Sequence, residues 1–228
     1  MIFLVDIHTH ILPFVDDGSA DLQTSVKMLE DQQKSGVDAV ILTPHYCPPR
    51  KYVKTAAEIK ETFENFKNEA KKAGVGVRLL LGQEIYWSNS YNVLKMLKSG
   101  ELLTLNGTNF VLLEFSFSTS AECVSEAIYS LKISGYRSII AHVERYKRID
   151  FSAVEDMREQ GALIQVNADS VIGKSGLKTK FFTNKLIKRR LVDFVASDVH
   201  SFRPSALEKA RKKLKTDKYF NALPELLK

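Results

Sequence analysis

Cysteine and long apolar stretches are scarce in this chain of 228 residues. Its two cysteines, Cys47 and Cys123, form neither a disulfide framework nor a metal-binding pair, which excludes a disulfide-stabilised miniprotein and a thiolate-rich zinc site. No apolar run approaches the roughly 18 residues that a membrane-spanning helix needs. Residues 1–6 lack the basic start of a secretory signal peptide and reach an acid too early. We therefore expect a cytoplasmic protein without membrane insertion.

Linkers, repeats and low-complexity segments are also missing. Apolar residues make up 44% of the chain, which excludes an intrinsically disordered protein. A length of 228 residues is ordinary for one α/β barrel, and folding a chain of this size buries a sizeable core. We expect residues 1–228 to form a single domain. The sequence carries no indication of an oligomeric state.

Positive charge is concentrated in two segments of a chain whose formal net charge is +6. Residues 174–190 hold seven Lys or Arg and no acid, and residues 208–218 hold six Lys or Arg and two acids. Such segments are compatible with binding to nucleic acid, a membrane surface or an acidic partner. They also coincide with predicted helices, where a solvated basic face is the simpler explanation. We favour the solvated face and predict no nucleic-acid binding.

Short apolar, β-branched runs alternate with longer segments of helical period. The predicted strands are residues 3–7, 37–42, 77–81, 110–113, 138–141, 163–166 and 192–196. The predicted helices are residues 22–35, 56–73, 121–134 and 153–160, each followed by a glycine. Three of these helices begin with a capping pair, namely Thr55 with Glu58, Thr119 with Glu122, and Ser152 with Glu155. This alternation predicts a largely parallel sheet of seven strands that closes, or nearly closes, into a barrel.

All five histidines of the chain directly follow predicted strands. Because chemistry in parallel α/β folds lies at the carboxyl ends of the strands, residues at these positions are expected to lie near one another. A single histidine at such a place is more often a cap or a hydrogen-bonding core residue, but that explanation fails for the set. The strand ends carry His8 with His10, His45, Glu84, Glu114, His142, Asn167 with Asp169, and Asp198 with His200.

Histidine, aspartate and glutamate without cysteine are the ligands of zinc, manganese or iron sites that perform hydrolysis. Asp16 and Asp17, in the turn that ends at Gly18, can add to the strand-end set. One ion with an open position uses three or four protein ligands, so this number of candidates predicts two or three ions bridged by carboxylates. Such a cluster favours an in-line displacement, usually at phosphorus.

Five ordered segments resemble the polymerase and histidinol phosphatase (PHP) superfamily. They are DIHTHILP at residues 6–13 with DDG at 16–18, TPHY at 43–46, GQEIY at 82–86, HVERY at 142–146 and ASDVH at 196–200. Within this superfamily the chain is similar to the bacterial manganese-dependent protein tyrosine phosphatases that accompany capsule and exopolysaccharide gene clusters. The resemblance implies a distorted, TIM-like (βα)7 barrel that hydrolyses phosphotyrosine. It also implies a protein substrate, namely the phosphorylated tail of a tyrosine kinase of the polysaccharide export machinery.

The resemblance further implies three metal ions and two arginines that bind phosphate. Manganese is expected, with iron or zinc as alternatives. Arg145 fits one arginine, and Arg203 is the candidate for the other, although residues 201–204 form a shorter stretch than the family has. Asp198 and His200 are also candidates for assisting the leaving group. The implied ligands are His8, His10, Glu84 and Asp198 for the first ion, Glu84, Glu114 and His142 for the second, and Asp17, His45 and His200 for the third.

Other functions are weighed against this one. A histidinol phosphatase would use the same cluster with a different rim, and remains the alternative. A cyclic amidohydrolase would place a metal-bridging lysine where this chain has Glu114. A binding module that kept the fold without activity would have lost ligands, and none is lost. A cysteine phosphatase needs an arginine six residues after the nucleophile, where Cys47 is followed by Val53 and Cys123 by Tyr129.

Several aromatic residues lie near predicted strand ends. They either stack on a phosphotyrosine ring or pack in the rim of the barrel, and the sequence does not separate the two roles. These residues are Tyr46, Tyr52, Tyr86, Trp87 and Tyr146.

Overall fold

The computed structural model describes residues 4–227, so Phe3 of the first predicted strand lies outside the described residues. All strand pairs in the described part of the chain are parallel. One sheet has the order β1–β2–β4, with β1 at Val5–Thr9, β2 at Ala39–Leu42 and β4 at Arg78–Leu81. The other has the order β3–β5–β6–β7–β8–β9, with bounds His45–Tyr46, Glu84–Tyr86, Phe110–Glu114, Arg137–Ile140, Leu163–Asn167 and Phe194–Ala196.

The two sheets form one curled parallel sheet. Strand β3 continues β2 after a break at residues 43–44. Strand β5 likewise continues β4 after a break at residues 82–83. The first strand meets the last through a bridge between Thr9 and Val199, where the His10 amide donates to the Val199 carbonyl (3.0 Å). Each of the predicted strands is therefore present, and they are arranged as a distorted barrel, as expected.

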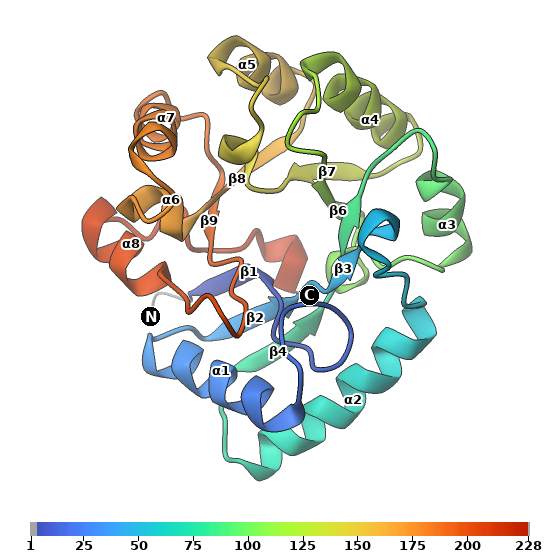
Figure 1. Cartoon of the computed structure of the whole chain (residues 1–228), viewed down its shortest axis with the longest axis vertical. Coiled ribbons are helices and arrows are strands. Elements are labelled where there is room, and N and C mark those ends of the chain that lie inside the picture. The colour runs from blue at the N-terminus through green and yellow to red at the C-terminus, as the bar shows by residue number, and fades with distance from the viewer. Residues whose placement is uncertain (1–3, 228) are drawn as a thin grey trace.

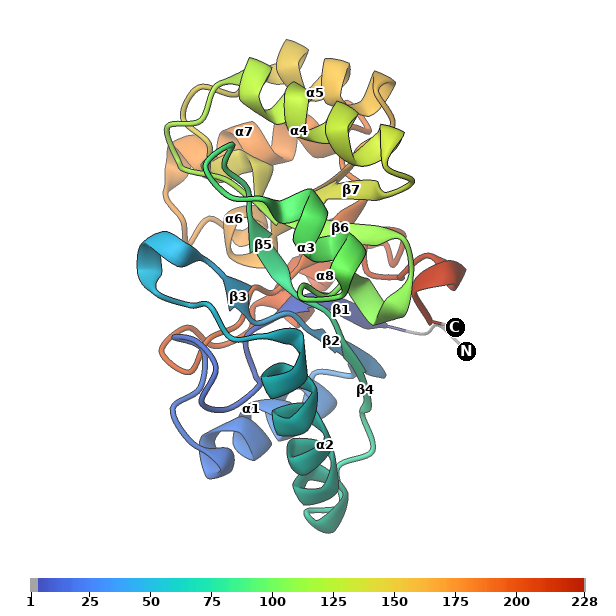
Figure 2. The ribbon, with the colours of Figure 1, turned by 90° about the vertical axis from the view of Figure 1, so that its right-hand side faces the viewer.

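Helices surround this sheet in the view of Figure 1. Figure 2 shows α1 and α2 at one end of the molecule and α4, α5 and α7 at the other. Both basic segments form helices, α7 and α8, as predicted. Within residues 4–227 no helix is long and apolar enough to cross a membrane. The helices are α1 (Leu22–Lys34), α2 (Ala56–Lys72), α3 (Val93–Ser99), α4 (Ala121–Ile133), α5 (Phe151–Glu159), α6 (Ala168–Ile172), α7 (Leu177–Lys188) and α8 (Leu207–Leu214), with 3-10 turns η1 (Pro48–Arg50), η2 (Leu105–Gly107), η3 (Val143–Arg145) and η4 (Pro224–Leu227).

The helix caps correct two of the three predicted capping pairs. The pair of Thr55 and Glu58 is confirmed, because each side chain accepts the other's backbone N–H. Helix α4 is instead capped by Ser120, whose hydroxyl accepts from the amide of residue 123. Helix α5 is capped by Asp150 and so begins two residues earlier than expected. The earlier start lets Phe151 pack against a phenylalanine of α7, which the local pattern does not reveal.

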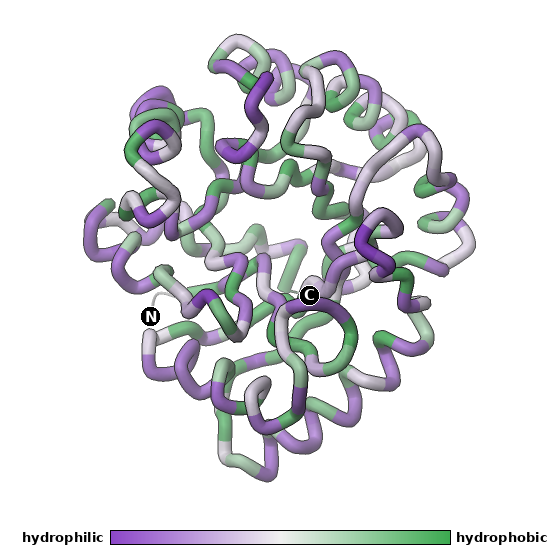
Figure 3. The backbone as a smooth tube through the Cα atoms, in the orientation of Figure 1, coloured by the Kyte–Doolittle hydropathy of each residue, from purple (hydrophilic) through white to green (hydrophobic). Residues whose placement is uncertain are grey.

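Two hydrophobic clusters fill the two sides of the sheet. The smaller one takes most of its members from alternate strand positions, such as Val5 and Ile7 of β1, and fills the barrel interior. The larger one joins the other strand face to the helices, where Leu29 of α1 and Ile59 of α2 are fully buried. Figure 3 shows hydrophobic residues concentrated along the strands and interspersed with hydrophilic ones on the surrounding helices. The open end of the barrel interior is left to polar residues.

Candidate metal centre

The predicted ligands converge on the carboxylate of Glu84, which is fully buried at the start of β5. Its oxygens lie 3.2 Å from His8 Nε2, 3.3 Å from His10 Nε2, 2.9 Å from His45 Nδ1 and 2.8 Å from His142 Nε2. The predicted ligands form four groups, and within each group the ligand atoms lie within 4.8 Å of one another. Together the groups include every residue of the predicted ligand set. The groups are His8, His10 and Asp198; His8, Glu84 and His142; His45, Glu84 and Glu114; and His10, Asp17, His45 and His200.

Strand alternation aims most of these side chains at the barrel mouth. Leu112 of β6 faces the interior, so Glu114 two residues later faces it as well. Asp198 follows Ala196, the last residue of β9 and also an interior residue, by two positions. Since these are the last inward positions of their strands, the polar residues form the rim above the apolar interior.

Two histidines break this alternation and are turned by local backbone irregularities. Val5 and Ile7 face the interior, so His8 would face the helices, but the pairing register of β1 shifts between Asp6 and Thr9. Such a bulge rotates the following side chains and is common beside active sites. His142 follows Ala141, which also faces the interior, and adopts a left-handed conformation with φ of 33°.

Left-handed backbone also occurs at Asp198, with φ of 50°. Non-glycine residues rarely adopt this conformation, which costs on the order of 1 kcal/mol or more. That His142 and Asp198 both adopt it, and both contact the same cluster, indicates that the cluster holds them there. Backbone strain of this kind gathers at functional sites.

Asp16 has a different role from the one that the sequence allowed for. Its carboxylate accepts from Nδ1 of His10 (2.7 Å) and from the backbone amide of His45 (2.9 Å), and it belongs to none of the four ligand groups. It therefore orients two histidines rather than adding a ligand. Gly18 closes the same turn, and a Cβ there would lie 2.0 Å from the His10 carbonyl oxygen, so only glycine fits.

Gln165 and Asn167 of β8 form a further layer of contacts behind the ligands. The Gln165 carbonyl oxygen accepts from His8 Nδ1 (3.2 Å) and from the His142 amide (2.8 Å). Asn167 Nδ2 donates to Asp198 (2.7 Å). Sequence reasoning noted Asn167 only as a residue at a strand end and missed Gln165, which lies inside an apolar strand. A fully buried glutamine within such a run was the available signal.

The hydrogen bonds of His8 and His10 determine which of their nitrogens are free. Because Nδ1 of each ring donates to Gln165 or Asp16, both Nε2 atoms carry lone pairs when the rings are neutral, and these atoms lie only 3.1 Å apart. Glu84 and Asp198 add carboxylate oxygens within 3.8 Å of them. Four acceptors without a donor between them are repulsive, and a cation is the group that makes the arrangement favourable.

The ionisation of the buried groups also favours positive charge at this place. Burial opposes protonation of His8 and His10, yet the neighbouring carboxylates raise the pKa of both imidazoles. Burial disfavours ionisation of Glu84, yet the nearby His8 and His45 hold its pKa well below the usual value. Burial and the neighbouring Glu84 charge raise the pKa of Glu114 to about 7. Burial, together with the adjacent Arg145 charge, lowers the pKa of His142 to about 4, so its imidazole is neutral, as a metal ligand requires.

Buried polar atoms without partners mark the same place. Within the described part of the chain, His45 Nδ1, Glu84 Oε2, Glu114 Oε2 and His142 Nδ1 have no hydrogen-bond partner. Such atoms are rare in folded proteins because an unpaired buried polar atom costs about 1–3 kcal/mol. All four residues belong to the ligand groups, while five further buried atoms without partners lie elsewhere in the described residues. The residues present therefore fit divalent metal ions bound by nitrogen and oxygen.

Both predicted arginines lie at the edge of this cluster. Arg145 of η3 and Arg203 each make an ion pair with Asp198, at 3.3 Å and 2.7 Å. The short stretch before Arg203 therefore does not keep its guanidinium away. A third arginine, Arg50 of η1, was not predicted, although its Nη1 lies 3.5 Å from His45 Nε2. It lies five residues after His45, outside the predicted strands and helices, where no periodicity of the sequence indicates which way a side chain points.

The aromatic residues near the centre differ in part from those expected. Tyr46, Trp87 and Tyr146 are buried and belong to the core, so of the two roles left open the structure supports packing for these three. Tyr146 uses its hydroxyl to accept the amide of residue 115 (3.1 Å). The exposed aromatic side chains beside the cluster are instead Phe117, whose ring is stacked on Arg145, and Phe202, next to His200. Tyr52 stacks on His45.

Cys47 lies close to His45 but has the wrong environment for a nucleophile. Its side chain is buried, and burial raises the pKa of the thiol, which disfavours the reactive thiolate. The rejection of a cysteine mechanism on sequence grounds is consistent with this environment.

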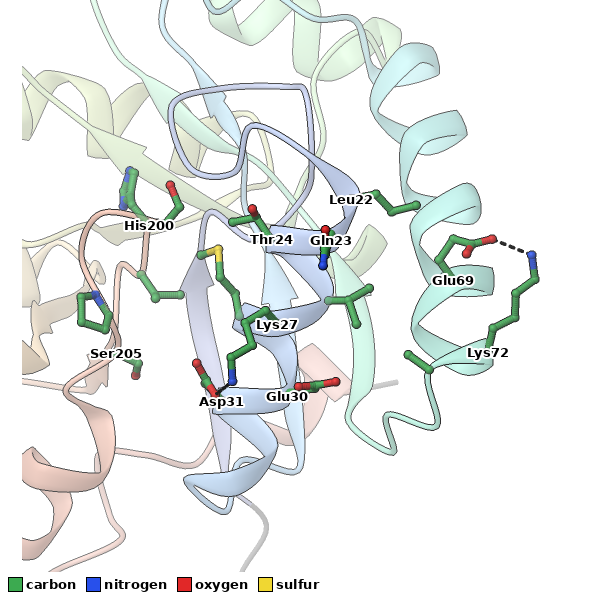
Figure 4. Close-up of a pocket in the computed structure, with 16 residues that line it drawn as sticks. Leu22, Gln23, Thr24, Lys27, Glu30, Asp31, Glu69, Lys72, His200 and Ser205 are labelled. Atoms are coloured by element: carbon green, nitrogen blue, oxygen red, sulfur yellow. Dashed lines mark hydrogen bonds and ion pairs between the residues drawn. The ribbon is translucent and has the colours of Figure 1, made fainter.

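A cavity of about 970 Å³ lies to one side of the centre rather than above it. It runs along the outer face of α1 between the end of α2 and residues 199–205, and His200 is the cluster residue that borders it (Figure 4). The Lys27–Asp31 ion pair of α1 and the Glu69–Lys72 ion pair of α2 lie on its walls. A smaller cavity of about 410 Å³ is lined by Arg145 and Arg203 and therefore opens directly beside the centre.

Comparisons with known proteins place this centre in a family. The family described as "Capsular polysaccharide synthesis, CpsB/CapC" matches residues 4–223. The tyrosine-protein phosphatase YwqE of Bacillus subtilis is 33% identical over 201 residues, covering 87% of this chain and 78% of that protein. The putative tyrosine-protein phosphatase CapC of Staphylococcus aureus is 31% identical over 229 residues, covering 99% of this chain and 89% of that protein.

Solved structures give the same result. The structure of YwqE from Bacillus subtilis and CpsB from Streptococcus pneumoniae, described as metal-dependent tyrosine phosphatases, matches with a TM-score of 0.86 at 31% identity, covering 98% of this chain and 89% of that one. A histidinol phosphate phosphatase of Lactococcus lactis with zinc, L-histidinol and phosphate has a TM-score of 0.60 at 14% identity, covering 96% and 95%, which shows the fold alone. As its motifs predicted, the chain belongs to the CpsB/CapC family of capsular polysaccharide synthesis proteins.

Proposed function

We propose that this chain is a metal-dependent protein tyrosine phosphatase that hydrolyses phosphotyrosine without a cysteine nucleophile. The observation that carries the proposal is the convergence of buried histidines and carboxylates on Glu84, with Arg145 and Arg203 at the edge of the cluster. Names of relatives support the substrate class, since those from Bacillus subtilis and Streptococcus agalactiae are called tyrosine-protein phosphatases. We take residues 1–228 to be one domain devoted to this activity.

The proposed cofactors are three divalent ions, with manganese as the metal. The first is assigned to His8, His10, Glu84 and Asp198, since their free acceptor atoms face one another. Glu84 is shared with the second, which Glu114 and His142 complete. The third is assigned to Asp17, His45 and His200, where Asp17 lies 3.5 Å and 3.6 Å from the two imidazoles. Nitrogen and oxygen ligands without thiolate suit manganese, iron and zinc.

The reaction that follows is hydrolysis of a phosphomonoester. When bound, divalent ions lower the pKa of a water molecule and polarise the phosphoryl oxygens. The guanidinium groups of Arg145 and Arg203 bind the nonbridging oxygens and neutralise the charge that spreads over them in the loose transition state. Asp198 holds both guanidinium groups beside the cluster through its ion pairs. The chain thus provides positioning and charge, which are the main contributions to phosphoryl transfer.

The leaving group makes small demands on the protein. A tyrosine side chain has a pKa of about 10, so the phenolate departs far more readily than the alkoxide of serine. Strong protonation by a general acid is therefore unnecessary. Asp198 and His200 are the side chains placed to assist, since His200 Nδ1 lies 3.0 Å from the Asp198 carbonyl oxygen and 2.8 Å from Arg203 Nη2, contacts that keep a fixed ring orientation.

The test is a comparison of three substrates on protein reconstituted with manganese. We expect the highest kcat/KM for phosphotyrosine, with much lower values for phosphoserine and histidinol phosphate. Asp198→Asn should abolish turnover, and the matched change Asp31→Asn, at an exposed position of α1, should leave it unchanged. A preference for histidinol phosphate would transfer the assignment to a small-molecule phosphatase. Activity without any metal would contradict the mechanism.

We further propose that the protein substrate is a cytoplasmic tyrosine kinase tail that regulates polysaccharide synthesis. Such a tail is acidic, because each phosphotyrosine carries about −1.5 to −2 charges, and the last turn of α7 is basic. Hydrolysis of a multiply phosphorylated tail should then depend on salt more than hydrolysis of para-nitrophenyl phosphate. Changing Lys188, Arg189 and Arg190 to Ala should reduce this difference. Equal salt dependence for both substrates would return the basic segment to a solvated face.

A further inference from the structure

The cavity beside Arg145 and Arg203 is also lined by a lysine and two hydroxyl residues, which the hydrolysis of a phosphate does not require. Its volume of about 410 Å³ is within the roughly 300–1,000 Å³ of small-molecule sites. Arg145, Arg203 and Lys174 line it, together with two hydroxyl residues, Ser175 between α6 and α7 and Thr179 in the first turn of α7. We name this cavity, lined by Arg145, Lys174, Thr179 and Arg203, the Lys174 pocket.

The charges of the Lys174 pocket are predominantly positive. Arg145, Arg203 and Lys174 are opposed within the lining only by Asp169. Arg145 and Arg203 are occupied by Asp198 and by the proposed phosphate, whereas Lys174 pairs with Asp169. A second anionic group is therefore what this side of the pocket favours.

Lys174 is exposed, and the carboxylate of Asp169 lies beside its ammonium group. Its Nζ lies 3.2 Å from the carboxylate of the buried Asp169, and its amide donates to the Asp169 carbonyl (2.9 Å). An ammonium group has three donors. Within the described residues Asp169 Oδ1 accepts no hydrogen bond, so this ion pair leaves the donors of Lys174 available for a ligand.

Phe117 adds an apolar wall to the Lys174 pocket. Its ring is stacked on the Arg145 guanidinium at 4.6 Å and is partly exposed. The carbonyl of Phe117 accepts the amide of Lys147 (2.9 Å), which ties this loop to η3. The phenyl ring of a phosphotyrosine bound at the arginines therefore has an apolar surface to pack against.

We propose that the Lys174 pocket binds an anionic side chain, carboxylate or phosphate, that neighbours the phosphotyrosine in the substrate. This inference rests on the proposed function and adds a substrate preference to it. Lys174 makes the contact, and Asp169 positions its ammonium group. The preference is for peptides in which an acidic residue flanks the hydrolysed phosphotyrosine.

Three phosphotyrosine peptides of equal length test the proposal, with glutamate, phosphoserine or glutamine beside the phosphotyrosine. The wild-type protein should show a kcat/KM for the glutamate peptide about fivefold above that for the glutamine peptide, the size of one partly exposed ionic contact. The phosphoserine arm shows whether the pocket prefers phosphate to carboxylate. Lys174→Gln should bring the ratio close to one, and Lys174→Arg should keep it because the charge is retained.

Lys178→Gln is the matched control, because Lys178 is exposed one turn away on α7 and does not line the pocket. It should keep the ratio of the wild-type protein. A wild-type ratio near one, or an equal loss of the ratio in Lys178→Gln, would overturn the proposal. These outcomes differ from failure of the proposed function, in which none of the three phosphotyrosine peptides would be hydrolysed.

Discussion

Glu84→Gln is the substitution with the largest expected effect on the centre. The carboxylate belongs to two of the four ligand groups and lies within 3.3 Å of four imidazole nitrogens. Glutamine keeps the shape but replaces one oxygen with an N–H donor and removes the charge. Loss of even a supporting contact to a metal ligand weakens binding by about 10–100-fold. Removal of a shared ligand should cost at least the upper value for both ions, or about 2.7 kcal/mol each.

The assay is metal content after gel filtration, together with kcat/KM for para-nitrophenyl phosphate. Glu84→Gln should lose two ions per chain and roughly 10³-fold or more in rate, since each ion contributes several kcal/mol to the transition state. Asp17→Asn is the control, because Asp17 belongs to one group and should release one ion only. Wild-type metal content and rate in Glu84→Gln, or the same loss in both variants, would refute the reasoning.

Three further predictions follow from other parts of the structure. Arg145→Ala should keep the metal content and lower kcat by roughly 10²-fold, as measured by steady-state kinetics, and an unchanged kcat would remove this residue from the site. Cys47→Ser should retain activity because the buried thiol is not the nucleophile, and a loss above tenfold would reopen the thiol mechanism. Thr55→Ala should lower the free energy of unfolding in urea by about 1 kcal/mol, since it removes the α2 cap. Hydrogen bonds from Thr55 lower the pKa of Glu58 to about 2, so its contribution to stability is present above about pH 4.5 and lost as the pH falls towards 2. The difference in unfolding free energy between wild type and Thr55→Ala should therefore shrink as the pH falls from about 4.5 to about 2. A difference that stays constant over this range would contradict that linkage.

The order of strands and helices was predictable because both depend on local periodicity. Runs of apolar residues coincide with the observed strands, and glycine follows α1, α2, α4 and α5 in the left-handed conformation that ends a helix. The caps of α4 and α5 were less predictable, since several neighbouring side chains are able to accept the same amide. The exact start then depends on tertiary packing, as Phe151 shows.

The meeting of the candidate ligands was also predictable, although their role as ligands stays a prediction. Parallel strands end at the same edge of a sheet, so Glu114 and Asp198 were expected at the same mouth of the barrel. The aromatic rim was not predictable in the same way. Phe117 and Phe202 lie in loops, where no periodicity indicates which side chain is buried, whereas Tyr46 and Tyr146 turned inward to the core.

The sequence by itself determined which residues stand at the strand ends, and hence that histidines and carboxylates gather without cysteine. Only the tertiary structure decided how they face one another. The bulge in β1 depends on pairing with β2, and it turns His8 towards Glu84. The ring of His8 is then oriented by Gln165, which lies 157 positions further along the chain. Register shifts and side-chain orientation depend on contacts between distant segments, and local sequence patterns contain no record of those contacts.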